Sequence, residues 1–197
     1  MKLYFSTLLL VLVLLSSCQQ DPKDRALEQE KETQKREVIF TTINNGWNFN
    51  SQPINETSRG LTTNWAEWRV FLNELSQKPK SSIGAFQQKA KTLSKRAAEL
   101  NNHIPIAYDL PEIKSRIAGL TTKINSINLY IHLNQIPAQK IVQLVQEVNV
   151  ELVSFQQQLS EIAFKKQIKI EDGEGDMIRM LDTTRAIPTN PVPKNIK

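Results

Sequence analysis

The sequence predicts an all-α protein, an antiparallel bundle of about four helices. Several long segments carry apolar residues at alternating spacings of three and four, the period of a helix that buries one face. Stop and turn signals separate these segments, among them Lys78-Pro79-Lys80 and the reversal at residues 134–137. With 197 residues, the chain is long enough for one domain that buries a sizeable core without a disulfide or a structural metal.

The four main helices are expected at about residues 63–76, 82–100, 109–131 and 137–169. Their apolar stripes are Trp65, Trp68, Leu72 and Leu75; Ile83, Phe86, Ala90, Leu93, Ala97 and Leu100; Ile113, Ile117, Leu120, Ile124, Ile127 and Ile131; and Ile141, Val145, Val148, Leu152, Phe155, Leu159 and Ile162. For the third helix, Asp109 is the expected N-cap, with Pro111 in the first turn and Glu112 completing a capping box. The fourth helix returns antiparallel to the third and is the longer of the two, so part of it is expected to overhang.

Two segments of different character precede these helices. Residues 19–37 contain six acidic and five basic residues and only two apolar ones, so we expect a solvated tether that is helical only transiently. The stretch from residue 41 to 62 combines turn signals with the large aromatic residues Trp47 and Phe49 and shows no helical period. It is expected to lie across the outside of the bundle as a pinned flap, because aromatic side chains favour burial.

The first 18 residues have the pattern of a targeting segment. A single positive charge is followed by an almost unbroken apolar run over residues 3–15. This run is too short for a transmembrane helix, which needs about 20 residues. The run ends in Leu15-Ser16-Ser17-Cys18, and Cys18 is the only cysteine of the chain. This motif resembles the lipobox of bacterial lipoproteins, in which a signal peptidase cleaves before the cysteine and the cysteine is acylated. The alternative is an ordinary secretory signal, or a membrane segment, with an incidental cysteine.

The lipoprotein resemblance implies a mature chain that begins at Cys18 and is held on a membrane by two or three acyl chains. Gln19 is not the aspartate that retains such proteins in the inner membrane, so the resemblance implies the outer membrane, on either the periplasmic face or the cell surface. The expected parts are a signal peptide at residues 1–17, a tether at residues 18–37, a bundle domain with an N-terminal flap at residues 38–181, and a disordered tail at residues 182–197.

The residue types of known catalytic and metal sites are not found at their usual spacings. The only close glycine pair, Gly173 and Gly175, lacks the third glycine of a dinucleotide-binding loop. The acidic run at residues 171–176 lacks the sixth-position glycine and the twelfth-position glutamate of an EF-hand, so a solvated loop is expected there. Glu99 and His103 have the spacing for one helix face but no further ligand follows. We therefore expect no enzyme activity, no metal site and no cofactor.

Two groups of side chains are candidates for a binding surface. The aromatic group could form a ligand platform, although tryptophans at helical spacing more often lie at the edge of a core. The basic group makes the second helix locally cationic and could contact an anionic partner, although a solvated helix face has the same composition. The members are Trp47, Phe49, Trp65 and Trp68 in the aromatic group, and Lys89, Lys91, Lys95 and Arg96 in the basic group.

Together these features favour a non-catalytic binding or structural accessory lipoprotein of the cell envelope, with an envelope protein as its partner. The alternative is a carrier for a small apolar or anionic ligand held between the helices, a common place for pockets in bundles. Nucleic acid is not an expected partner, since a net charge of +5 is modest for that role. The oligomeric state is left open by the sequence.

Overall fold

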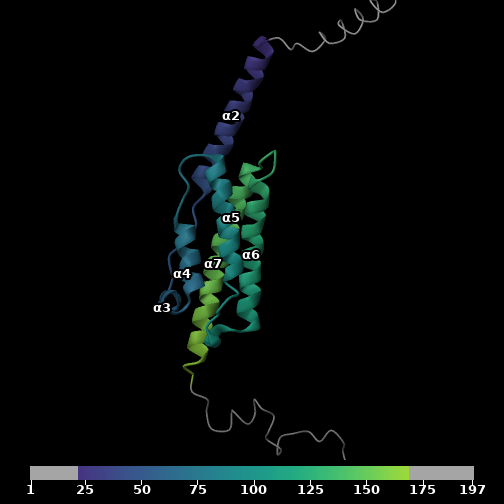
Figure 1. Cartoon of the computed structure of the whole chain (residues 1–197). Coiled ribbons are helices and arrows are strands. Elements are labelled where there is room, and N and C mark those ends of the chain that lie inside the picture. Colours follow the sequence, from purple (N-terminus) through teal and green to yellow (C-terminus); the bar gives the residue numbers. More distant parts are fainter. Residues whose placement is uncertain (1–21, 169–197) are drawn as a thin grey trace, which may run out of the picture.

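The computed structural model of this chain describes residues 22–168, which form helices and connecting loops with no strand. The all-α prediction is therefore confirmed for this part of the chain. Six α-helices and one 3-10 turn follow one another (Figure 1). Their bounds are α2 Pro22–Gly46, α3 Glu56–Asn64, α4 Ala66–Ser76, α5 Ile83–Glu99, η1 Ile106–Tyr108, α6 Pro111–Ile131 and α7 Ala138–Lys165.

Several predicted features lie outside the described residues. They are the signal segment, the lipidation residue Cys18, the acidic run at residues 171–176 and the tail at residues 182–197. Of the helices that the structure does describe, none is both long enough and apolar enough to cross a membrane.

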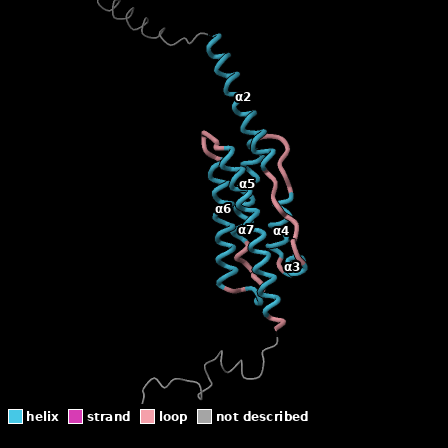
Figure 2. The backbone as a smooth tube through the Cα atoms, turned by 180° about the vertical axis from the view of Figure 1, so that it is seen from behind, coloured by secondary structure: helices cyan, strands magenta, loops and turns pink. Residues whose placement is uncertain are grey.

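The helices pack side by side, and α7 packs against α2, α3 and α6. The helix α6 lies between α5 and α7 in the order of the chain and packs against both, reversing direction each time (Figures 1 and 2). On the other side, α4 packs on α5, and α3 packs on both α4 and α7. The last part of α2 also packs on α7, whereas its first part projects beyond one end of the bundle. The helix α7 ends at the opposite end.

The predicted apolar stripes form the hydrophobic core. All stripe residues of α6 and α7 are buried, and so are those of the second predicted helix except Ile83, which is half-buried. The small residues Ala90 and Ala97 leave room beside α5, and Thr121 of α6 donates a hydrogen bond across the contact to the carbonyl of Ala97 at 3.2 Å. Each buried leucine or isoleucine contributes about 1.5–3 kcal/mol, so this pattern supplies most of the packing energy.

The irregular segment before α3 is shorter than predicted. The helix α2 continues through residues 41–46, because Ile43 is buried on the core and gives these turns an apolar side. The next helix begins early because the Asn55 side chain accepts a hydrogen bond from the backbone N–H of Ser58 at 2.8 Å and caps it. Between α2 and α3, irregular structure is therefore limited to residues 47–55.

Two predicted helix boundaries are wrong. The helix expected over residues 63–76 is divided at Trp65, whose backbone is extended and separates α3 from α4. The expected capping box at the start of α6 does not form, because Leu110 occupies the N-cap position and Asp109 lies one residue earlier. Asp109 instead pairs with Lys114 at 2.7 Å.

The predicted overhang of the last helix exists, and a loop covers part of it. The helix α7 has 28 residues and α6 has 21, so α7 is longer by about 10 Å at 1.5 Å per residue. Beyond the end of α7, Lys166 donates a hydrogen bond to the carbonyl of Ala107 at 2.7 Å and lies over the ring of Tyr108. Phe164 and Ile168 remain exposed, with 65% and 56% of their surface accessible.

Gly46 lies close to Val142 where α2 packs on α7, which predicts an effect on stability. A Cβ added at Gly46 would lie 2.7 Å from Cγ1 and 2.9 Å from Cβ of Val142, whose branched side chain has little freedom to move. We expect Gly46→Ala to lower the free energy of unfolding by about 1–3 kcal/mol, measured by chemical denaturation. The matched control is Gly60→Ala in α3, where nothing lies within 4 Å of the new Cβ. The control should be neutral or stabilising by up to about 1 kcal/mol, and equal losses at both positions would contradict the close contact.

Candidate functional site

The three tryptophans lie inside the protein, so the predicted aromatic surface is not present at the surface. Trp47 is 2% exposed, and Trp65 and Trp68 have no exposed area. Phe49 is half-buried, with its ring edge-on to Trp47 at a centroid distance of 5.4 Å. The packing of α3, α4 and the start of the irregular segment on the bundle covers the rings, so their role is structural.

The aromatic side chains form two clusters that join separate helices. In the first, Phe86 of α5 contacts Trp47, which directly follows α2, at a centroid distance of 5.1 Å. Phe86 also contacts Phe40 of α2 at a centroid distance of 6.0 Å. In the second, Phe155 of α7 contacts Trp68 at 5.2 Å, and Trp65 lies 6.2 Å away. Edge-to-face pairs of this kind add about 0.5–1.5 kcal/mol each to the burial of the rings. The aromatic residues therefore fix α2, α3 and α4 on the bundle.

The most buried of the predicted basic residues, Lys89, is used within the fold. Its ammonium group contacts the carboxylate of Glu74 in α4 at 2.5 Å, with 10% and 18% of the two side chains exposed. A pair with so little solvent access costs several kcal/mol when one partner is lost, because the other charge is left without compensation. Lys89 therefore links α4 to α5 and does not offer its charge to a partner.

The other three basic residues of α5 are only partly available to an anionic partner. Arg96 pairs with Glu99 at 2.8 Å, and Lys95 lies 4.0 Å from the same carboxylate. Lys91 is exposed and has no ion pair among residues 22–168. The structure therefore does not gather the four predicted residues into one cationic site.

The structure separates Glu99 and His103, the pair with helical spacing. Glu99 pairs with α5 cations, whereas His103 lies beyond the helix with a φ of 52°. The Nδ1 of His103 donates a hydrogen bond to Glu67 at 2.8 Å, and this bond lowers the pKa of the Glu67 carboxyl. Within residues 22–168, no three His, Cys, Asp or Glu side chains come together in a way that could hold a metal ion.

Two polar residues of α7 hold the irregular segment, and neither is among the residues predicted from the sequence. The amide oxygen of Asn149 accepts a hydrogen bond from the backbone N–H of Asn50 at 2.7 Å. The side-chain oxygen of Gln156 accepts one from the backbone N–H of Ile54 at 3.0 Å. Gln156 is completely buried. The sequence does indicate a special role for Gln156, because Gln156 lies one helical turn after Leu152, on the helix face that otherwise carries apolar residues.

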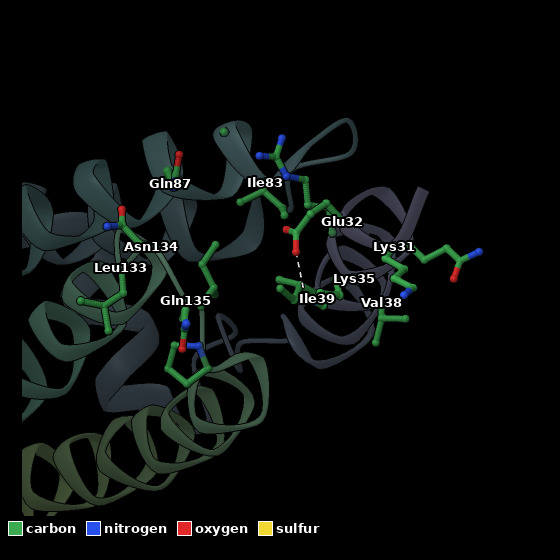
Figure 3. A pocket seen from close by; sticks show the side chains of 15 residues that line it. Lys31, Glu32, Lys35, Val38, Ile39, Ile83, Gln87, Leu133, Asn134 and Gln135 are labelled. Carbon is green, nitrogen blue, oxygen red and sulfur yellow. Dashed lines mark hydrogen bonds and ion pairs between the residues drawn. The ribbon is translucent and has the colours of Figure 1, made fainter. Parts of the chain in front are cut away.

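A cleft with a volume of ≈ 1310 Å³ opens where the projecting part of α2 meets the end of the bundle. In Figure 3, Ile39 of α2 lies on one side of the opening, and Ile83 of α5 and Leu133 lie on the other. Six of the lining residues are apolar, namely Val38, Ile39, Ile83, Leu133, Ile136 and Pro137. The exposed fractions of Val38 and Leu133 are 66% and 42%, so the cleft presents apolar surface to solvent.

The charged residues of the cleft all come from α2 and are mostly cationic. Lys31, Lys35 and Arg36 supply three positive charges against the single carboxylate of Glu32. Lys35 pairs with Glu32 at 2.8 Å, and this hydrogen bond is the main cause that lowers the pKa of the Glu32 carboxyl. No ion pair of Lys31 or Arg36 occurs among the described residues, so their charges are open to a partner.

The helix ends at the cleft add to its positive potential. Two helices, α5 and α7, begin there, and neither carries an acidic residue in its first turn. The other four α-helices of the described chain each have one, namely Asp24, Glu56, Glu67 and Glu112. An N-terminus without an acidic residue in its first turn keeps about half a positive charge. The C-terminus of α6 also lies at the cleft and adds about half a negative charge. The sum of these ends is positive, in agreement with the cations of α2.

The sequence pattern does not predict this cleft. Lys31 and Lys35 are one turn apart, a signal of a common helix side, but they fall in the segment predicted to be a tether. Because the cleft needs α2 to be a rigid helix placed against the bundle, its existence depends on tertiary packing.

Comparison with protein-family models, with curated proteins and with solved structures gives no match for this chain. The features of this chain that bear on its function are the cleft and the motif at Leu15-Ser16-Ser17-Cys18.

The contact between His103 and Glu67 predicts a pH effect. We expect His103→Ala to raise the pKa of Glu67 toward the ordinary value of a glutamate, because the hydrogen bond to the carboxylate is lost. A lowered pKa stabilises the fold at pH values above the unfolded-state pKa, and this contribution is lost as the pH falls through the folded-state pKa. The variant should therefore be less stable than the wild type above that range and equal to it below.

An NMR titration of the Glu67 carboxyl carbon measures the shift directly. The matched control is His132→Ala, since Nδ1 of His132 bonds to the carbonyl of Asn128 in its own helix. A Glu67 pKa that stays the same in His103→Ala would contradict the contact.

Proposed function

We propose that this chain is a lipid-anchored lipoprotein of the bacterial cell envelope, acting as a non-catalytic binding or structural accessory subunit of an envelope complex. The observation that carries the binding role is the open cleft beside α2, which combines apolar surface with a net positive charge. Exposed apolar surface bounded by charged residues is typical of a surface that docks a partner. The partner is expected to present an anionic segment with apolar side chains.

The proposed anchor rests on the motif that ends in Cys18 and on the shape of α2. Residues 22–37 of α2 are charged or polar on all sides, apart from Ala26 and Leu27, so this part has no apolar face with which to bury itself in the bundle or in a bilayer. The cleft is lined from Lys31 onward, so residues 22–30 precede it, and they span about 14 Å at 1.5 Å per residue. In this proposal they are a rigid spacer that holds the cleft at a set distance from the outer membrane.

The body of the proposed subunit is an antiparallel bundle whose four main helices are α4, α5, α6 and α7. The lipid, the charged segment at residues 18–37 and a solvated tail at residues 182–197 complete the proposed organisation. A rigid body of this kind suits a docking role, because little conformational entropy is lost when a preorganised surface binds.

A second candidate function, a carrier for a small anionic amphiphile, draws on the same mixture of cationic and apolar residues in the cleft. Two observations make it weaker. The cleft volume of ≈ 1310 Å³ exceeds the about 300–1,000 Å³ of most small-molecule sites. The cleft also lies between α2 and the end of the bundle, whereas the space between the packed helices is filled by core side chains. Mass spectrometry of an organic extract of the purified protein would detect a carried amphiphile.

The anchor is tested by the intact mass of the protein extracted from membranes. We expect the wild-type chain to begin at Cys18 and to carry the mass of two or three acyl chains. Cys18→Ala should retain residues 1–17 and carry no lipid, because the acceptor thiol is missing. Ser17→Ala keeps a small residue before the cysteine and should be processed like the wild type. A wild-type chain without acyl mass would contradict the proposed anchor.

The binding role is tested by native affinity purification from membranes. We expect an envelope protein to co-purify in stoichiometric amount with the wild type and to be lost with Lys35→Glu/Arg36→Glu, which reverses the charge of the cleft. Lys91→Glu/Lys95→Glu changes the net charge equally on the exposed side of α5 and should retain the partner. The proposal fails if no stoichiometric partner is found, or if the cleft variant retains it.

A further inference from the structure

The chain itself contains a segment with the chemistry that the cleft beside α2 requires. Residues 168–181 hold four carboxylates and two cations, so their net charge is −2. The carboxylates are Glu171, Asp172, Glu174 and Asp176. Apolar residues flank them on both sides, namely Ile168, Ile170, Met177, Ile178, Met180 and Leu181. The cleft has the opposite net charge, +2, together with its apolar lining.

The carboxylates of this segment cannot reach the cleft of their own molecule. The cleft lies at the start of α7, whereas Ile168 comes three residues after the last residue of that helix. The start and the end of α7 lie at opposite ends of the bundle (Figure 1). The 28 residues of α7 span about 42 Å. Asp176 is eight residues after Ile168, and eight fully extended residues reach about 28 Å at most. Any docking of these carboxylates must therefore occur on another molecule.

We propose that the cleft beside α2 binds residues 168–181 of a second copy of the chain, which makes the protein associate head to tail. Each copy offers one cleft at one end of the bundle and one segment at the other, so every contact is heterologous and leaves a further cleft and segment unused. Such contacts produce a ring where the rotation closes and an open chain where it does not. Lys31 and Arg36, whose charges are open, contact the carboxylates beside the Lys35–Glu32 pair, and the apolar flanks lie on Ile83 and Leu133.

The size of the cleft agrees with a peptide occupant. Its volume of ≈ 1310 Å³ is larger than most small-molecule sites, and its apolar lining comes from α2, from α5 and from the turn before α7. A segment with apolar anchors and charged neighbours is recognised in such grooves by burial of the anchors and by complementary charges at the rim. A single acyl chain would instead leave much of its surface in water, because the cleft is open.

The first test is direct binding of a fluorescein-labelled synthetic peptide of residues 168–181, measured by fluorescence anisotropy. The receptor is the full chain with Cys18→Ala, purified in a non-ionic detergent. We expect saturable binding that weakens as NaCl rises from about 50 to about 500 mM, because salt screens the charge pairs. Lys35→Glu/Arg36→Glu should weaken binding by about tenfold or more, and Lys91→Glu/Lys95→Glu should leave it unchanged.

The second test separates association between molecules from any contact within one molecule. The cleft variant Lys35→Glu/Arg36→Glu and the segment variant Asp172→Lys/Glu174→Lys each bring like charges together and should be monomeric alone. A mixture of the two restores opposite charges at both kinds of contact and should form larger species in sedimentation velocity. Circular dichroism of each variant checks that the helices are retained, since the substituted positions in α2 are exposed.

The proposal is overturned if the peptide does not bind, if the cleft variant binds it as tightly as the wild type, or if the mixture stays monomeric. It is also overturned if phosphatidylglycerol vesicles, and not the peptide, bind in a manner that depends on Lys35 and Arg36, because the occupant is then a lipid headgroup. These tests use purified protein without a lipid anchor or an envelope partner. Failure here with a partner still retained through the cleft would overturn self-association alone, and the proposed function would stand.

Discussion

Burial of α7 is the constraint on which the rest of the structure depends. This helix packs against α2, α3 and α6, and its apolar stripe from Ile141 to Ile162 is buried along its length. Its polar residues Asn149 and Gln156 hold the irregular segment that connects α2 to α3. Because one helix contacts elements from both halves of the chain, its position decides where α2 ends, where α3 begins and which aromatic rings are covered.

The proposed binding role follows from the way in which α2 leaves the bundle. Its last turns are held by Ile43 and by the aromatic contacts to Phe86, whereas its first turns have nothing apolar to bury. The cleft forms where the packed part of α2 passes into its projecting part. Cations of α2 there face the N-termini of α5 and α7. A flexible tether with the same composition would carry the same charges without a defined position, and it would form no cleft.

The sequence was a good guide to the core and a poor guide to the candidate site. The stripes of α6 and α7 were predicted residue by residue, because a period of three and four is a direct consequence of helical geometry. Trp47 and Trp65 were placed on a candidate surface, yet both are buried, since composition does not reveal which elements cover a ring. The sequence predicts that Lys89 contacts an anionic partner, but the carboxylate of Glu74 from the neighbouring helix pairs with it.

By itself, the sequence determined the all-α class, the apolar stripes and the reversal between α6 and α7, because these depend on contacts between residues close in the chain. Tertiary structure alone decided the continuation of α2 through Gly46, the division of the next helix at Trp65 and the cleft beside α2. Each of these features is stabilised by contacts between residues far apart in sequence. Local propensity is too weak to specify them, since differences of about 1 kcal/mol per residue are easily outweighed by the burial of a single large side chain.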